Sequence, residues 1–170
     1  VAAGSFSARK LVPGERIGLV ELTGAIADPE PVNRQLRHFR DVEKVPAILL
    51  RIDSPGGYVG ASQEINRQVE LLRQRGIKVI ASMGNVAASG AYYVAIAADT
   101  IMANPGTITG SIGVIAEFPQ ADTLLRKVGL AFNVVKSGRY KDTGSPTRPM
   151  RGDEQELLQS VVDDTYRQFR

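Results

Sequence analysis

The sequence predicts a single α/β domain built on a largely parallel sheet. Short apolar runs rich in β-formers alternate along the chain with stretches of helical periodicity, and glycine and proline separate many of them. This order of elements is typical of right-handed β-α-β crossovers. With 170 residues the chain is long enough for one such domain with its own core.

The N-terminal half is the more regular. Residues 1–15 are small and polar, and we expect a loose entry segment there. Apolar runs predict strands over 17–22, 46–52 and 77–82, and helical spacing predicts helices from Val32 onward, over 61–75 and over 88–98. The second strand is nearly continuous in apolar residues, which is typical of a strand covered on both faces. Glycines predict turns at Gly56-Gly57 and at Gly84, where the second and third strands end.

The C-terminal half mixes short runs with polar loops. We predict strands over 100–103, 114–115 and 132–135, helices over 120–129 and 153–169, a glycine-rich loop over 104–113 and a polar loop over 137–149. The chain begins with Val1 rather than methionine and ends at Arg170, inside a predicted helix. We therefore expect an excised or processed domain.

The composition argues against several kinds of site. There is no cysteine, which removes thiol catalysis, cysteine-zinc sites and disulfides, and the only histidine is His38. The basic residues are scattered without interleaved aromatics, so nucleic acid is not an expected partner. No apolar run reaches the roughly 18–20 residues that span a membrane, and no signal peptide is visible.

The segment 83–97 holds the leading candidate for chemistry. Small residues surround Ser89 between a predicted strand and a predicted helix, where unpaired N–H groups and the helix dipole favour a developing negative charge. A nucleophilic serine needs such a place, although an N-cap serine would also occupy it. The N–H groups of Gly57 and Gly90 could form a two-donor oxyanion hole, with close approach to Gly57 left open by its missing side chain. The alternative for residues 53–57 is a plain turn.

A nucleophilic serine also needs a base. His38 belongs to an early helix, and we expect it near the surface. A lysine can replace histidine if burial lowers its pKa from the usual value of about 10.4. Lys141 is the candidate because neither helical nor strand periodicity explains its loop; a solvated loop lysine is the alternative. Asp142 would raise the pKa of Lys141 if close, so this carboxylate is expected to point away.

Four sequence blocks together resemble the signal peptide peptidase A family of Ser-Lys peptidases, which share the Clp protease/crotonase fold. The blocks are DSPGG at 53–57, MGNVAASGAYY at 83–93, TGSIGV at 109–114 and KSGRYKDTGSP at 136–146. They occur in the family's order and with its spacing between serine and lysine. The resemblance implies one peptidase domain over 1–170, with mostly parallel sheets, flanking helices and repeated ββα-type units.

The resemblance assigns a role to each matching residue. Ser89 matches the nucleophile, Lys141 the general base, and Ser111 a serine that orients the lysine. Gly57 and Gly90 match the oxyanion-hole amides. The expected substrate-binding residues are Gly56, Ile112 and Gly113.

Two departures from the family pattern are visible. Ala91 stands where relatives often have a second glycine, a change that a helix tolerates. Family members also usually continue beyond the position of Arg170, so part of the family's fold or subunit interface is expected to lie outside this chain.

The implied reaction is acyl transfer without a metal or cofactor, on cleaved signal peptides and other apolar peptides in or near a membrane. The resemblance also implies a ring-like homo-oligomer in which Lys141 reaches Ser89 of a neighbouring subunit, so isolated monomers are expected to be inactive. A membrane anchor outside this chain, N-terminal to it, would hold the domain on the extracytoplasmic side. The alternatives are a crotonase-like acyl-CoA enzyme and a non-catalytic membrane-associated scaffold.

Overall fold

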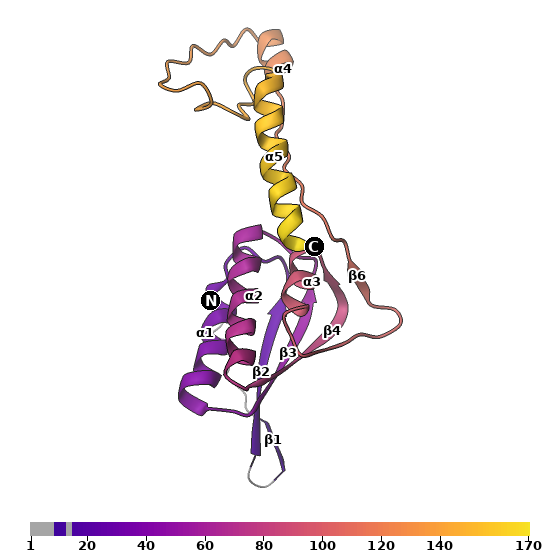
Figure 1. Ribbon diagram of the computed structural model, residues 1–170. Helices are drawn as coiled ribbons and strands as arrows, with labels where there is room; N and C mark the ends of the chain where they lie inside the picture. The colour runs from indigo at the N-terminus through magenta and orange to yellow at the C-terminus, as the bar shows by residue number, and fades with distance from the viewer. Residues whose placement is uncertain (1–8, 13–14) are drawn as a thin grey trace. The chain divides into compact units, whose positions relative to one another are not determined.

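The computed structural model describes residues 9–12 and 15–170. The chain forms two compact units, Val1–Ile112 and Gly113–Arg170. Figure 1 shows the course of the chain through both. The positions of the units relative to one another are not determined, so each is described by itself.

The first unit is an α/β unit whose described strands form one sheet in the order β1-β2-β3-β4-β5, with β6 also paired to β4. All pairings are parallel except that of β1 with β2. The prediction of an α/β fold with a parallel sheet is therefore confirmed. The strands are β1 (Arg9–Val12), β2 (Glu15–Thr23), β3 (Ala47–Ser54), β4 (Lys78–Ala88), β5 (Thr100–Met102) and β6 (Ile108–Gly110).

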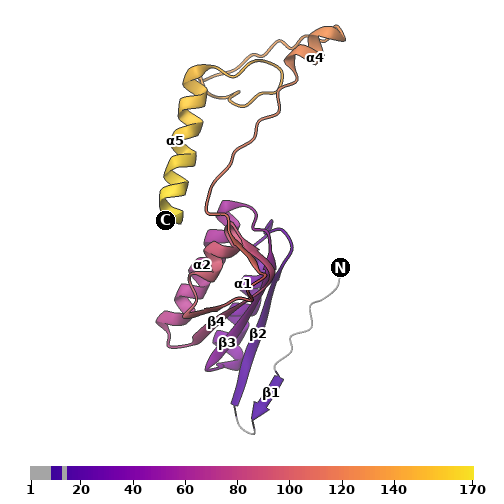
Figure 2. The same ribbon diagram turned by 90° about the vertical axis from the view of Figure 1, so that its right-hand side faces the viewer.

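Helices cover one face of this sheet. Figures 1 and 2 show α1, α2 and α3 together on that face. Leu36, Phe39, Ile65 and Val69 lie at this interface and are fully buried with the apolar side chains of β3. The helical elements are α1 (Glu30–His38), the π-helical turn η1 (Phe39–Glu43), α2 (Val59–Gln74) and α3 (Gly90–Ala95).

The expectation that the second strand is covered on both faces is wrong for this unit. Buried and half-buried residues alternate strictly along β3. Leu50 and Ile52 point into the helical layer, whereas Leu49 and Arg51 lie on the half-buried face. Alternation is the pattern of a sheet packed on one face, because successive side chains point to opposite sides.

Gly84 does not end a strand, contrary to the prediction. β4 continues through an irregularity, with Ile52 paired to Met83 and Ser54 paired to Ala87. The Asp53 carboxylate accepts hydrogen bonds from Asn85 Nδ2 and from the N–H of Val86, both at 3.1 Å. A Cβ at Gly84 would lie 2.9 Å from that carboxylate. Residues 84–86 stand opposite Asp53 alone and lose the regular bonds between strands. The Asp53 carboxylate replaces part of these bonds, and regular pairing resumes at Ala87.

The second unit contains α4 (Asp122–Lys127) and α5 (Gly152–Phe169), joined by turns and irregular segments. Both predicted helices are confirmed within a few residues. The strands predicted over 114–115 and 132–135 are wrong: no regular structure forms there, and Val134 and Val135 are exposed. A strand needs a partner to bond its backbone, and β-propensity alone does not supply one.

At the N-terminus, the loose segment expected over residues 1–15 is wrong in part, because residues 9–12 form β1 and Glu15 begins β2. The rest of that segment, residues 1–8 and 13–14, lies outside the described residues. Across the part of the chain that the structure describes, no helix has the length and apolar character needed to cross a membrane.

Candidate active site

The predicted site residues of the first unit gather at the carboxyl ends of three parallel strands. Gly56 follows β3, Ser89 follows β4 directly, and Ser111 follows β6. Ala88 of β4 is paired with Gly110 of β6 in a parallel register. Ser89 follows the first of these residues and Ser111 the second, so the two serines come at the same level of neighbouring strands. The N–H of Ser89 donates to the carbonyl of Gly110 at 2.8 Å. Parallel sheets place ligand sites at this edge.

Ser89 occupies a sharp strand-to-helix turn. Its backbone has φ 53° and ψ −126°, a conformation that side-chain-bearing residues rarely adopt. It stands at the N-cap position of α3, yet its side chain makes no capping hydrogen bond. The N-cap interpretation therefore describes the position of Ser89 but not what its hydroxyl does. The hydroxyl is left available at the end of β4.

Gly56 packs directly against the serine turn. Its φ is +96°, and an added Cβ would lie 2.7 Å from the nitrogen of Gly90 and 2.8 Å from Cβ of Ser89. The carbonyl oxygen of Ala88 would also be only 2.8 Å away. Both the backbone conformation and the space require glycine here.

The amides of Gly57 and Gly90 lie close together. An added Cβ at Gly90 would be 3.4 Å from the nitrogen of Gly57. Gly90 is the first residue of α3, where N–H groups have no partner within the helix. Within residues 9–12 and 15–170, neither amide donates to a backbone or side-chain acceptor. Two N–H groups are thus available beside Ser89, as an oxyanion hole requires.

Gly57 is a glycine for a different reason from the one the sequence suggested. It forms an isolated parallel bridge with Ile26. A Cβ at Gly57 would lie 2.2 Å from the carbonyl oxygen of Ile26. The missing side chain therefore allows the Ile26 backbone to approach. The hydrogen bonds of this bridge are made by Gly56 and Tyr58, the residues before and after Gly57, so the N–H of Gly57 has no partner among the described residues. Ile26 donates to Gly56 at 2.9 Å, and Tyr58 donates to Ile26 at 2.8 Å.

Sequence reasoning missed the residues that hold this site in place. Asn66 Nδ2 of α2 donates to the carbonyl of Tyr93 in α3 at 2.7 Å. Ser62 of α2 packs so closely on Gly90 that an added Cβ would lie 2.2 Å from its Oγ. Asp53 fixes the irregularity of β4 ahead of Ser89. The DSPGG block was the available signal for Asp53, whereas no sequence signal marks Ser62 and Asn66, polar residues that are buried in α2.

Lys141 lies in the second unit, and its position relative to Ser89 in the first unit is not determined. It is exposed in a run of turns, and its N–H donates to the carbonyl of Gly138 at 3.4 Å. Its side chain has no ion pair with a described residue. Ile112, which is exposed, ends the first unit, and Gly113 begins the second. The contact of Ser111 with Lys141 therefore stays a prediction.

The carboxylate next to Lys141 is taken by other cations. Asp142 is bonded to Lys136 through one oxygen and to Arg148 Nε at 2.9 Å through the other. These contacts hold the pKa of Asp142 well below its usual range, chiefly through the hydrogen bond from Arg148. This agrees with the expectation that the carboxylate does not serve as the counter-ion of Lys141.

Acid should loosen the second unit. The hydrogen bond from Arg148, with that from the N–H of Arg151, lowers the pKa of Glu154 from 4.5 to about 2. A carboxyl whose pKa is lowered by folding stabilises the fold above its unfolded pKa, and this contribution is lost as the pH falls toward the folded value. We expect the melting temperature to fall between about pH 5 and pH 2, and to fall less in Glu154→Gln. Equal acid sensitivity of both proteins, followed by circular dichroism, would contradict this assignment.

His38 is not part of the gathered site. Its Nε2 lies 3.2 Å from Oε1 of Glu43, and its ring meets Phe39 edge-on. The side chain is 32% exposed, which agrees with the expected near-surface position. Among the described residues, no group of three or more histidine, aspartate or glutamate side chains is placed to hold a metal ion.

A serine at a strained strand-to-helix turn, with two available amides beside it, is the arrangement of an α/β enzyme that attacks carbonyl groups through a nucleophilic serine. The sequence profile of peptidase family S49 matches residues 71–170. The chain therefore belongs to peptidase family S49. The matched range includes both Ser89 and Lys141, while Gly56 and Gly57 precede it.

Similar proteins occur in several organisms. The chain is 49% identical over 157 residues to the Synechocystis sp. protein slr0021, 36% identical over 170 residues to "Serine protease SPPA, chloroplastic" of Arabidopsis thaliana, and 35% identical over 163 residues to "Protease 4" of Haemophilus influenzae. These matches cover 91%, 99% and 91% of this chain. The chain spans 56% of the first relative and about a quarter of the other two (24% and 26%).

Among solved structures, the chain resembles the 1510-N membrane-bound stomatin-specific protease in a mutant form. The TM-score is 0.54 at 24% identity, over 61% of this chain and 51% of the other. At this identity the likeness shows a shared fold and nothing more.

Proposed function

We propose that this chain supplies the catalytic domain of a serine peptidase with a Ser-Lys dyad, which degrades cleaved signal peptides and other apolar peptides at or near a membrane. In this proposal the two units act as one peptidase domain. Membership of family S49 favours this reaction over that of an acyl-CoA enzyme.

The observation that carries the proposal is the strained turn at Ser89. A backbone conformation of this kind costs on the order of 1–3 kcal/mol and persists where the surroundings enforce it. Here Gly56 fills the space beneath Ser89, and the ladder bond to Gly110 fixes its N–H. A scaffold without activity would gain stability by relaxing this turn. An active nucleophile needs it, because the turn sets the hydroxyl beside the amides of Gly57 and Gly90.

The proposed mechanism is acyl transfer through these groups. Neutral Lys141 takes the proton of Ser89 as Oγ attacks the peptide carbonyl, and the amides of Gly57 and Gly90 bind the oxyanion. The protonated amine then donates to the leaving nitrogen, the C–N bond breaks, and an acyl-enzyme remains. Water, deprotonated by the same lysine, hydrolyses the ester and restores the serine.

The substrate and the assembly follow the same proposal. The apolar side chains of Ile108 and Ile112 are exposed next to Ser111, where they offer contacts to an extended apolar peptide. Gly56 and Gly113 would leave room for its backbone. Lys141 would be delivered to Ser89 of a neighbouring subunit in a ring-like homo-oligomer, held on the extracytoplasmic side of a membrane by an N-terminal anchor outside this chain.

Hydrolysis of a fluorogenic apolar peptide tests the proposal. We expect activity that rises with pH as the base loses its proton, and a loss of roughly 10³-fold or more in Lys141→Ala. Lys127→Ala, an exposed lysine in α4 of the same unit, is the matched control and should keep full activity. Full activity in Lys141→Ala would show that another group is the base.

A further inference from the structure

The second unit buries charge in place of apolar surface. Among its residues only Asp122 and Glu154 are buried, and Glu154 is fully buried at 0% exposure. Most of its large apolar side chains, such as Val135 and Phe132, are exposed, and the others are half-buried. A carboxylate removed from water is strongly unfavourable unless cations and hydrogen bonds compensate for it. The compensating contacts therefore show what organises this unit.

Arg148 connects the loop of Lys141 to the start of α5. Its Nε and Nη2 donate to Oδ2 and to the carbonyl of Asp142, at 2.9 and 3.1 Å. Its Nη1 and Nη2 donate to the two oxygens of Glu154, at 2.8 and 2.5 Å. This is a two-sided bidentate clamp, which fixes a guanidinium in direction as well as in distance.

Glu154 is in turn fixed by the first turn of its own helix. It accepts the N–H of Arg151 at 2.9 Å, which closes the capping box of α5, and Arg151 Nη2 lies at 2.7 Å. Thr143, two residues after Lys141, donates to it at 3.4 Å. Glu154 thus holds both Arg148 and the loop at a helix end that cannot easily shift.

We propose that Arg148 and Glu154 are positioning residues for Lys141, which hold the carboxylate of Asp142 on Arg148 and so prevent it from becoming the counter-ion of the neighbouring lysine. The proposal rests on the proposed function of Lys141 as the base. It goes beyond that function by assigning a role to residues that touch neither the substrate nor Ser89.

The charge of the Asp142 carboxylate explains why Lys141 has to be kept apart from it. A carboxylate close to an amine stabilises the ammonium form and raises the pKa of the amine. A base must be neutral, and at a fixed pH each unit of increase in the pKa of an amine lowers its neutral fraction about tenfold. The other charged groups bonded within this loop and the start of α5 are Lys136, Arg139, Arg148, Arg151, Asp153 and Glu154.

The test is the titration of Lys141 itself in protein labelled with ¹³C at lysine Cε. The signal is identified by its absence in Lys141→Arg. In Arg148→Gln only Lys136 still holds Asp142, so we expect the ¹³C titration of Lys141 and the pH of half-maximal kcat/KM to move together to higher pH. Adding Asp142→Asn to Arg148→Gln should return both values to those of the wild type. If Arg148→Gln instead acted through a general loss of structure, kcat/KM would fall and the added Asp142→Asn change would not restore the wild-type values.

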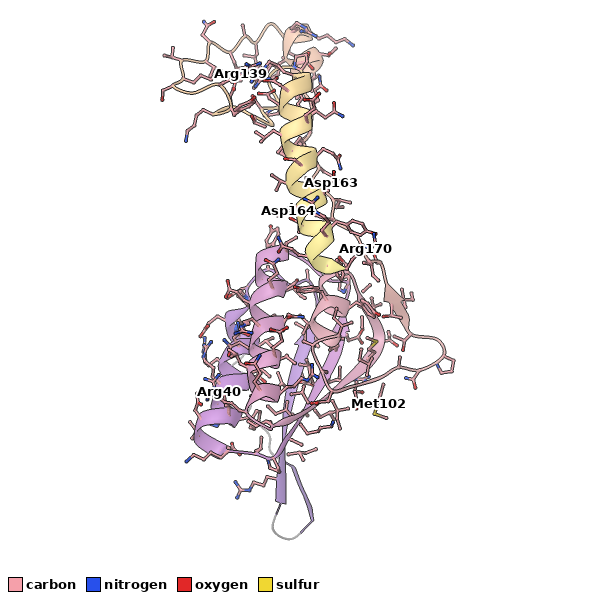
Figure 3. The ribbon with its side chains drawn as sticks, viewed as in Figure 1. Arg40, Met102, Arg139, Asp163, Asp164 and Arg170 are labelled. Atoms are coloured by element: carbon pink, nitrogen blue, oxygen red, sulfur yellow. The ribbon has the colours of Figure 1, made fainter. Side chains whose placement is uncertain are left out.

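Asp164→Asn is the control variant. Asp164 is exposed and pairs with Arg167 at 3.1 Å. Figure 3 shows Arg139 near the beginning of α5, whereas Asp164 lies toward the other end of that helix. This variant should leave the titration unchanged. In Glu154→Gln the neutral amide holds Arg148 less firmly, so Arg148 in turn holds Asp142 less firmly. This variant should give a shift in the same direction and of smaller size, and it can be measured if Arg148→Gln does not fold.

The proposal is overturned if Lys141 titrates at the wild-type pH in folded Arg148→Gln or Glu154→Gln. This outcome is distinct from a failure of the proposed function. If Lys141→Ala kept its activity, Lys141 would not be the base, while the ¹³C titration would still report whether Arg148 keeps Asp142 from it.

Discussion

Replacing Ser89 with alanine is expected to abolish peptide hydrolysis, by roughly 10⁴-fold or more, and to leave the fold intact. Alanine keeps the Cβ that packs on Gly56 and removes only Oγ, which makes no capping hydrogen bond. Hydrolysis of the fluorogenic apolar peptide and the melting temperature should be measured on the same preparation. An unchanged melting temperature with lost activity separates chemistry from folding.

Ser89→Gly sharpens this prediction. Glycine adopts positive φ without strain, so this variant should be inactive and more stable than the wild type by about 1 kcal/mol. Measurable hydrolysis in either variant would contradict the assignment of Ser89. A lower stability of Ser89→Gly would contradict the argument that strain is held at this turn for the sake of function.

Replacing Gly56 with alanine should have the second large effect. The new Cβ would lie within 2.8 Å of Gly90, Ala88 and Ser89, at a φ of +96° that alanine rarely adopts. The turn must move, and a displacement of the nucleophile or of the Gly90 amide by a few tenths of an ångström weakens the attack. We expect kcat/KM to fall by about 10²-fold or more and the free energy of unfolding to fall by about 2 kcal/mol or more.

Gly60→Ala is the matched control for this prediction. Gly60 lies in the first turn of α2, where an added Cβ meets nothing within 4 Å. Alanine favours the helix, so this variant should keep full activity and be slightly more stable. Gly56→Ala with wild-type kcat/KM would show that the close packing beneath Ser89 is not required for catalysis.

The parts of the fold that could be predicted are those whose pattern is local. The core strands β2 and β3, the first half of β4 and the helix α2 were readable because their apolar runs and apolar spacing are local features of the sequence. The junction of a strand with a helix at Ser89 was readable for the same reason. The unpaired amide at Gly90 followed from helix geometry, whereas that at Gly57 depends on its bridge to Ile26, which is distant in the sequence.

The parts that failed depend on partners distant in the sequence. Gly84 lies inside β4 because Asp53, on the neighbouring strand, supplies bonds that no local rule foresees. The strand predicted at 132–135 lacks a partner. The positive φ of Ser89 and Ser111 and the burial of Glu154 were equally invisible, because each is imposed by packing around the residue.

The most direct test of the account is to locate the acyl-enzyme. The protein should be treated with an apolar peptide ester, quenched in acid and mapped by mass spectrometry after proteolysis. The account predicts one ester adduct, on the peptide that contains Ser89, absent from Ser89→Ala and strongly reduced in Lys141→Ala. An adduct on another residue, or one that persists in Ser89→Ala, would contradict it.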